Sequence, residues 1–87
     1  MPKILKSEYI RISKTIIRKL YTTGCFGKGS VYIQVLKSGI PNTDIEKVEP
    51  VLEALINQEI CGKKKKQFGW KYYLNMEKID KIREILK

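Results

Sequence analysis

The sequence predicts an α+β fold, because two kinds of hydrophobic pattern share its 87 residues. Four stretches carry apolar residues at helical spacing, whereas residues 60–75 have the pattern of two strands joined by a turn. The expected order is helix, short strand, two helices, strand, wing, strand and helix. This order is typical of a winged helix-turn-helix domain, with a three-helix core, a small antiparallel sheet that forms the wing, and a C-terminal helix. We therefore expect residues 1–87 to form a single winged-helix domain.

The first helix is expected to follow a basic lead-in at residues 1–6. Ser7 can cap its N-terminus, so that the helix starts near Glu8 and has an acidic residue in its first turn. Gly24 is expected to end it in a left-handed conformation. The apolar stripe that would face the core consists of Ile12, Ile16, Ile17 and Leu20.

A short strand and a second helix are expected next. Cys25 and Phe26 would form the first strand, which pairs with the later hairpin. Ser30 would open a helix over residues 31–38, which ends at Gly39 before a turn at residues 41–43.

The third helical stretch is expected over residues 44–58, capped by Thr43 or Asp44. Pro50 lacks a backbone N–H and clashes with the preceding turn of a helix. We therefore expect a short turn over residues 44–48 and the helix proper after it. Its apolar stripe is Ile45, Val48, Leu52, Leu55 and Ile56, and its outward acidic residues are Asp44, Glu46, Glu49 and Glu53.

Residues 60–75 are expected to form the wing, a β-hairpin with a basic tip and an aromatic return strand. The tip would carry Lys63–Lys66, which must face water or a polyanion because burying unpaired ammonium groups is costly. The two-residue period of a strand divides the return strand between two faces. The face expected to pack on the helices carries Trp70, Tyr72 and Leu74, and the opposite face carries Lys71, Tyr73 and Asn75. A fourth helix is expected at residues 76–87, with Ile79, Ile82, Ile85 and Leu86 as its stripe.

Charge and residue usage narrow the classes of function. The chain carries 18 Lys and Arg against 9 Asp and Glu, a net charge of +9 that favours a nucleic-acid partner. It has no histidine, so we expect no enzymatic activity, no catalytic residues, no cofactor and no small-molecule substrate. Cys25 and Cys61 lack metal-site spacing and are expected to be small buried side chains rather than metal ligands. Apolar runs of signal or membrane length do not occur, which favours a cytoplasmic or nuclear protein with no membrane partner.

The candidate nucleic-acid contacts are basic and aromatic residues of the wing and the first helix. The first choices for RNA contacts are Lys63, Lys64, Lys65, Lys66 and Lys71, and the second choices are Arg11, Lys14 and Arg18. Trp70 and Phe68 are candidates for stacking on bases, although hairpin packing also accounts for Trp70. The acidic third helix is a poor reader of a DNA major groove, because its carboxylates would repel phosphates. This favours binding of the RNA backbone and shape.

Several short runs near the end of the chain carry a family resemblance. They are Gln67-Phe68-Gly69-Trp70-Lys71, Tyr72-Tyr73-Leu74-Asn75 and Ile82-Arg83-Glu84-Ile85-Leu86, with weaker matches at Met1-Pro2-Lys3 and Ile40-Pro41-Asn42. Together they resemble the winged-helix domain of eukaryotic small-subunit ribosomal protein S-ten, in a shortened and divergent form. The family has a glycine just after the third helix, where this chain has Gln58-Glu59, and its long Gly/Arg-rich tail does not occur here. Arg18-Lys19-Leu20-Tyr21 is also similar to the ribosomal S-nineteen family.

The resemblance implies a structural constituent of the small (40S) ribosomal subunit. Such a protein would lie on the head of the subunit and bind ribosomal RNA and neighbouring ribosomal proteins through its basic wing. The alternatives are a DNA-binding winged-helix transcription regulator, an RNA polymerase-associated subunit, and a winged helix that binds proteins through its acidic third helix.

Overall fold

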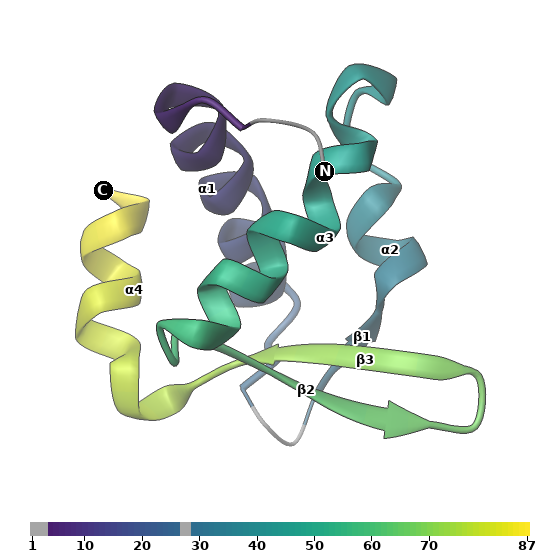
Figure 1. The fold of residues 1–87 in the computed structure, drawn as a ribbon. Helices are drawn as coiled ribbons and strands as arrows, with labels where there is room; N and C mark the ends of the chain where they lie inside the picture. The colour runs from purple at the N-terminus through teal and green to yellow at the C-terminus, as the bar shows by residue number, and fades with distance from the viewer. Residues whose placement is uncertain (1–3, 27–28) are drawn as a thin grey trace.

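The computed structural model describes residues 4–26 and 29–87, and within them the chain forms an α+β domain (Figure 1). Its elements are α1 (Lys6–Thr22), β1 (Val31–Tyr32), α2 (Ile33–Lys37), α3 (Asn42–Asn57), β2 (Cys61–Lys66), β3 (Gly69–Leu74), the 3-10 turn η1 (Met76–Lys78) and α4 (Ile79–Leu86). The predicted α+β class with a small antiparallel sheet and a C-terminal helix is confirmed, and the arrangement is compatible with a winged-helix-like fold. Half of the predicted basic lead-in, residues 1–3, lies outside the described residues.

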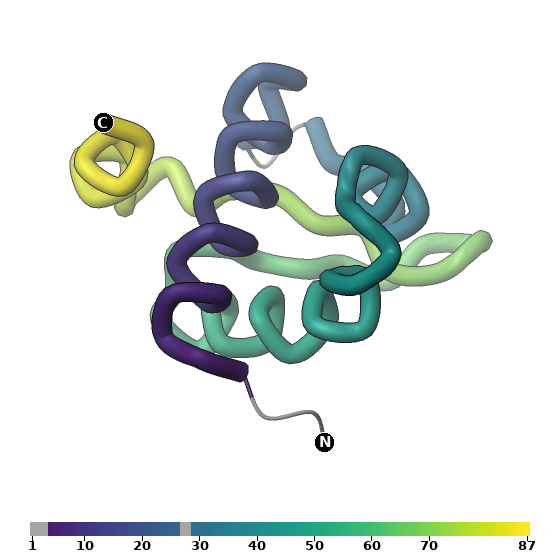
Figure 2. The backbone as a smooth tube through the Cα atoms, turned by 90° about the horizontal axis from the view of Figure 1, so that it is seen from above, coloured from purple at the N-terminus to yellow at the C-terminus, as the bar shows by residue number. Residues whose placement is uncertain are grey.

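The three strands form one antiparallel sheet in the order β1-β3-β2. β2 and β3 pair along their whole length, from Cys61 with Leu74 to Lys66 with Gly69, whereas β1 contributes only Val31 and Tyr32. We call the β2–β3 hairpin the wing. Its far end extends beyond the helices in both views (Figures 1 and 2). The predicted hairpin is therefore present, and its far end projects from the helical core.

The core lies where α1 and α3 pack together over the sheet. The predicted stripe of α1 is confirmed, because Ile12, Ile16, Ile17 and Leu20 are each at most 2% exposed. The buried residues of α3 and β3 that pack against this stripe are Val48, Val51, Leu52, Leu55, Tyr72 and Leu74. Truncating a fully buried leucine to alanine costs roughly 2–5 kcal/mol, so this packing holds the wing root to the helices. Figure 2 shows α1 between α4 on one side and α2 on the other.

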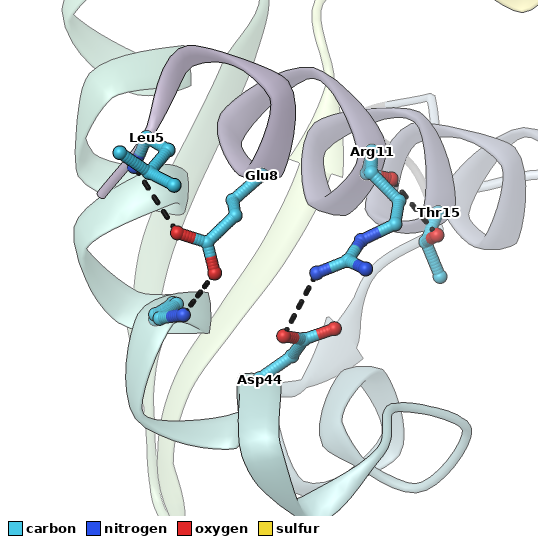
Figure 3. Close-up of polar contacts among 6 residues, drawn as sticks. Leu5, Glu8, Arg11, Thr15 and Asp44 are labelled. Carbon is cyan, nitrogen blue, oxygen red and sulfur yellow. Dashed lines mark hydrogen bonds and ion pairs between the residues drawn. The ribbon is translucent and has the colours of Figure 1, made fainter.

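The start of α1 differs from the prediction, and its end agrees with it. The helix begins at Lys6 with Leu5 as its N-cap, so Ser7 does not cap it. Leu5 has no polar side chain, but the Glu8 carboxylate accepts a hydrogen bond from the Leu5 backbone N–H at 3.2 Å (Figure 3). A glutamate at the third helical position commonly satisfies the N-cap in this way. At the other end Gly24 has φ +72°, as the left-handed cap requires.

The first strand and the second helix lie later than predicted. The strand is β1 at Val31–Tyr32 rather than Cys25–Phe26, and α2 starts at Ile33 rather than at residue 31. Cys25 donates its N–H to the carbonyl of Leu20 at 2.9 Å, which keeps it at the end of α1. A single sheet-like bond remains, from the Leu74 N–H to the Cys25 carbonyl at 2.7 Å.

The third helix is one continuous element, which contradicts the predicted split at Pro50. α3 starts at Asn42 with Pro41 as its N-cap, so neither Thr43 nor Asp44 caps it, and it runs through Pro50 to Asn57. Buried residues on both sides of the proline hold the two halves against α1 and outweigh its roughly 3 kcal/mol penalty. Figure 1 shows the helix changing direction partway along, as a proline within a helix produces.

The C-terminal helix begins with a tighter turn than predicted. Met76–Lys78 is the 3-10 turn η1, and the α-helical part starts at Ile79. Asn75 caps this turn, because its side-chain oxygen accepts the Glu77 N–H at 3.1 Å. Of the predicted stripe Ile82 is fully buried, whereas Ile79, Ile85 and Leu86 are half-buried. None of the helices in residues 4–26 and 29–87 is long and apolar enough to cross a membrane.

Candidate nucleic-acid interface

The register of the wing assigns each of its side chains to one of two faces. Directly paired residues on antiparallel strands project to the same side. The inner face, which continues the core, carries the pairs Cys61–Leu74, Lys63–Tyr72 and Lys65–Trp70. The outer face carries the pairs Gly62–Tyr73, Lys64–Lys71 and Lys66–Gly69. The predicted alternation of the return strand is thus confirmed.

The four consecutive lysines do not form the tip of the wing, which corrects the prediction. Lys63–Lys66 lie within β2, and the turn consists of Gln67 and Phe68. The lysines therefore divide between the two faces rather than gathering at one point. Phe68, a stacking candidate, is 75% exposed at the turn.

The outer face combines lysines with tyrosines. β1 extends it, because Tyr32 pairs with Lys71. The Lys71 ammonium lies 4.9 Å from the centre of the Tyr32 ring, and the Lys64 ammonium lies 5.7 Å from the centre of the Tyr73 ring. These contacts hold the cations over aromatic faces while leaving the surface positive. We call this surface, consisting of Tyr32, Lys64, Lys66, Lys71 and Tyr73, the outer wing face.

A glycine sets the shape of this surface. The Tyr73 ring lies across β2 at Gly62, where an added Cβ would come within 2.5 Å of the ring carbon Cζ. Any other residue at position 62 would therefore push the ring away. The ring lies flat across the strand only because Gly62 has no side chain.

Lys64 and Lys71 form a like-charge pair at the centre of the outer wing face. They are direct cross-strand partners, so their side chains leave the sheet side by side. Like charges placed in this way destabilise a sheet, by up to about 1 kcal/mol. An anionic partner would remove this cost, which makes the pair a candidate anion contact.

The inner face of the wing uses its lysines differently. The Lys63 ammonium donates to Glu53 of α3 at 2.8 Å and lies 4.8 Å from the centre of the Trp70 ring. The hydrogen bond to Glu53 raises the pKa of Lys63 above its ordinary value. Lys65 lies 5.9 Å from the same indole, which is 42% exposed. Lys63 is therefore bound to other residues of the protein. Trp70 is partly exposed, and two lysine ammonium groups lie over its ring.

The basic residues predicted on α1 do not join the wing. Arg11 donates to the Asp44 carboxylate at 3.0 Å (Figure 3). The Asp44 side chain is only 9% exposed, so the prediction that it faces outward on α3 is wrong. Lys14 is half-buried and Arg18 is exposed, and neither lies on the sheet. The rest of the predicted acidic row is confirmed, because Glu46, Glu49 and Glu53 are exposed.

Two site residues were missed by sequence reasoning. Tyr32 falls within the predicted second helix, and that prediction does not place it beside Lys71. Tyr73 lies on the predicted face of the return strand, but the predicted stacking residues are only Trp70 and Phe68. The signal for Tyr73 was present in the two-residue period, whereas the signal for Tyr32 depends on a strand of only two residues.

The cysteines agree with the prediction. Cys25 and Cys61 are both free and buried. Burial raises the pKa of the Cys61 thiol to about 12, so it is protonated and unreactive at neutral pH. Within residues 4–26 and 29–87, no group of three His, Cys, Asp or Glu residues is placed to hold a metal ion.

Comparisons of this chain with protein-family models, with curated proteins and with solved structures found no match. The class of this protein is therefore described from its own fold and candidate site alone. It is a small basic α+β domain whose sheet presents lysines and tyrosines on one face and packs on helices with the other.

Proposed function

We propose that this protein is a winged-helix RNA-binding protein and a structural constituent of the small ribosomal subunit. The outer wing face carries the proposal, because it places three ammonium groups and two phenol rings together on one face of the sheet. Ammonium groups neutralise phosphates, and aromatic rings stack on unpaired bases at roughly 1–3 kcal/mol per base. Single-stranded RNA loops offer both features at once.

The spacing of the lysines suits a flexible polyanion. Neighbouring strands lie about 5 Å apart, and residues two apart on one strand lie about 7 Å apart. Lys64 and Lys71 are neighbours across strands, and Lys66 follows Lys64 on the same face. The three ammonium groups can therefore reach successive phosphates of one strand. A bound phosphate between Lys64 and Lys71 would also offset the repulsion between their ammonium groups.

The third helix argues against reading of a DNA major groove. In DNA-binding winged helices this helix enters the groove and contacts base edges. Here Glu46, Glu49 and Glu53 line its exposed side. Their carboxylates would approach phosphates on both walls of the groove and repel them. RNA binding through the wing avoids this conflict.

The proposed ribosomal role is supported by a sequence resemblance. The Phe68-Gly69-Trp70 run and the last helix resemble the ribosomal protein S-ten family. One departure from the family is explained by the backbone. The family has a glycine after the third helix, and this chain has Glu59 there with φ +63°. This is the left-handed conformation that glycine favours. The left-handed backbone at Glu59 supports the resemblance although the glycine itself is missing.

The test compares two variants with the same charge. K64Q/K66Q/K71Q removes three positive charges from the outer wing face, and the α4 variant K81Q/R83Q/K87Q removes three from α4 and its C-cap. Binding of a fluorescently labelled single-stranded RNA is measured by anisotropy over a series of salt concentrations. The wing variant should reduce the slope of log affinity against log salt by about 2, with little change for the α4 variant. Equal losses of RNA affinity in both variants would mean that binding reflects the net charge of the protein and not the outer wing face.

The ribosomal role requires a second measurement. The tagged protein should sediment with small subunits in a sucrose gradient of cell extract, and K64Q/K66Q/K71Q should shift it to the free fractions. A wild-type protein found only in the free fractions would reject the ribosomal role. A footprint on one duplex DNA sequence that persists at moderate salt would favour a transcription regulator or a polymerase-associated subunit instead.

A further inference from the structure

An open groove of about 610 Å³ runs between α3 and the inner face of the wing. One wall is the exposed side of α3 and the other is the wing, so the groove lies on the opposite side of the hairpin from the outer wing face. The residues that determine its chemistry are Glu46, Glu49, Glu53, Lys63, Trp70 and Tyr72. The groove therefore has an acidic wall and an aromatic wall.

The charge of the groove is opposite to that of the whole protein. Three carboxylates and one ammonium group line the groove, so its net charge is −2. The net charge of the whole chain is +9. Glu46 has no ion-pair partner among residues 4–26 and 29–87, and Glu49 reaches only Lys37 at 3.7 Å. Both carboxylates are exposed and available to a ligand.

The protein itself shows which chemical group the groove accepts. The Lys63 ammonium lies between the Glu53 carboxylate at 2.8 Å and the Trp70 ring at 4.8 Å. An ion pair on one side and an aromatic face on the other together make up a recognition site for ammonium and guanidinium groups. The raised pKa of Lys63, caused first by its hydrogen bond to Glu53, agrees with this arrangement.

We propose that this groove binds a basic segment, rich in arginine and lysine, of a protein partner. An incoming guanidinium can stack on the exposed part of Trp70 and form paired hydrogen bonds with Glu49. A second cation of the same segment can pair with Glu46. The acidic wall excludes nucleic acid, so the two faces of one hairpin take ligands of opposite charge. The proposal does not depend on RNA binding by the outer wing face.

The probe is a labelled peptide that alternates arginine and lysine with glycine, and the control peptide has glutamine at every basic position. A protein of net charge +9 should repel a cationic peptide, so saturable binding already requires a local acidic site. Binding is followed by anisotropy and by the fluorescence of Trp70, the single tryptophan of the chain. The peptide should bind and change this fluorescence, and the control peptide should do neither.

Two variants with the same charge locate the site. E46Q/E49Q/E53Q removes three negative charges from the groove, and E77Q/D80N/E84Q removes three from exposed positions on η1 and α4. The groove variant should bind the peptide at least about tenfold more weakly, while the other variant stays within about twofold. Circular dichroism and thermal melting confirm that both are folded. Equal losses in both variants, or no saturable binding by the wild type, would overturn the proposal.

The outcome is independent of the proposed RNA binding. K64Q/K66Q/K71Q should bind the peptide as well as the wild type does, or better, because it lowers the net positive charge. Analytical ultracentrifugation tests for another occupant of the groove, the basic wing of a second copy of this chain. Self-association that the groove variant abolishes would overturn the proposal in favour of that occupant.

Discussion

The α1–α3 seam and the outer wing face use charge in opposite ways. In the seam each carboxylate lies beside a cation: Glu8 pairs with Lys47, and Asp44 pairs with Arg11. On the outer wing face Lys64 lies directly opposite Lys71. Both arrangements lie on helices or strands, so neither results from an irregular loop.

Under the proposed function, the difference separates charges that stabilise the fold from charges that bind a ligand. A pair of opposite charges in a partly buried seam helps to hold two helices in register. A pair of like charges on a sheet costs stability, and an anionic ligand would offset that cost. Arg11 and Lys71 are both basic residues of a basic protein, but Arg11 pairs with Asp44 whereas Lys71 lies opposite Lys64 on the sheet.

Arg11→Ala should have the largest effect on stability. It leaves the nearly buried Asp44 carboxylate without its cation, which we expect to lower the free energy of unfolding by about 1–2 kcal/mol. RNA affinity should stay within about twofold of the wild type. Urea denaturation measures the free energy of unfolding, and anisotropy measures the RNA affinity.

Arg18→Ala, at an exposed position of the same helix, serves as the control and should change stability by less than about 0.5 kcal/mol. A loss of RNA affinity as large as that of Lys71→Gln would place Arg11 in the binding surface.

Gly62→Ala should displace the Tyr73 ring from the outer wing face. The added methyl group would overlap the ring, so the ring must move away. We expect a coupling of about 1 kcal/mol between the two positions, measured by urea denaturation of the two single variants and the double variant. Alanine at position 62 should be better tolerated when Tyr73 is also alanine. Additive effects would show that the ring does not depend on the glycine.

Lys71→Gln should make the protein more stable and weaken its binding of RNA. Removing one charge of the Lys64–Lys71 pair relieves a cross-strand repulsion of roughly 0.2–1 kcal/mol. The net gain is smaller than this repulsion, because the contact of the Lys71 ammonium with the Tyr32 ring is lost as well. Thermal melting at low salt measures the gain, which should shrink as salt screens the repulsion. Lys81→Gln, an exposed change of the same kind on α4, should show no such gain. A less stable Lys71→Gln protein would mean that the lysine serves the fold.

Acid should weaken the α1–α3 seam slightly. The hydrogen bond from Lys47 lowers the pKa of Glu8 below its ordinary value of 4.5. The stabilisation is therefore complete above pH 4.5 and is lost as the pH falls through the lower pKa of the folded protein. Urea denaturation from about pH 5 to about pH 3 should show a smaller loss of stability in Glu8→Gln than in the wild type. Identical pH profiles would remove Glu8 from the seam.

Local patterns predicted the elements that have their own strong signal. The stripe from Ile12 to Leu20 and the alternation from Trp70 to Leu74 each repeat over several residues, and both were confirmed. Predictions at single positions were less successful. The cap at Ser7, the break at Pro50 and the outward direction of Asp44 were each reasonable from the local sequence and wrong in the structure.

The sequence by itself determined that this is a small basic α+β protein with a lysine-rich, aromatic hairpin, because hydrophobic periodicity and net charge are properties of the chain alone. Only the tertiary structure decided what each charge does. Lys63 and Lys64 are neighbours in the sequence, yet the pleat directs one toward Glu53 and the other toward Lys71 and Tyr73. The partner of a charge lies across strands and helices that are distant in sequence. Pairing therefore depends on how these elements pack, and no local pattern encodes it.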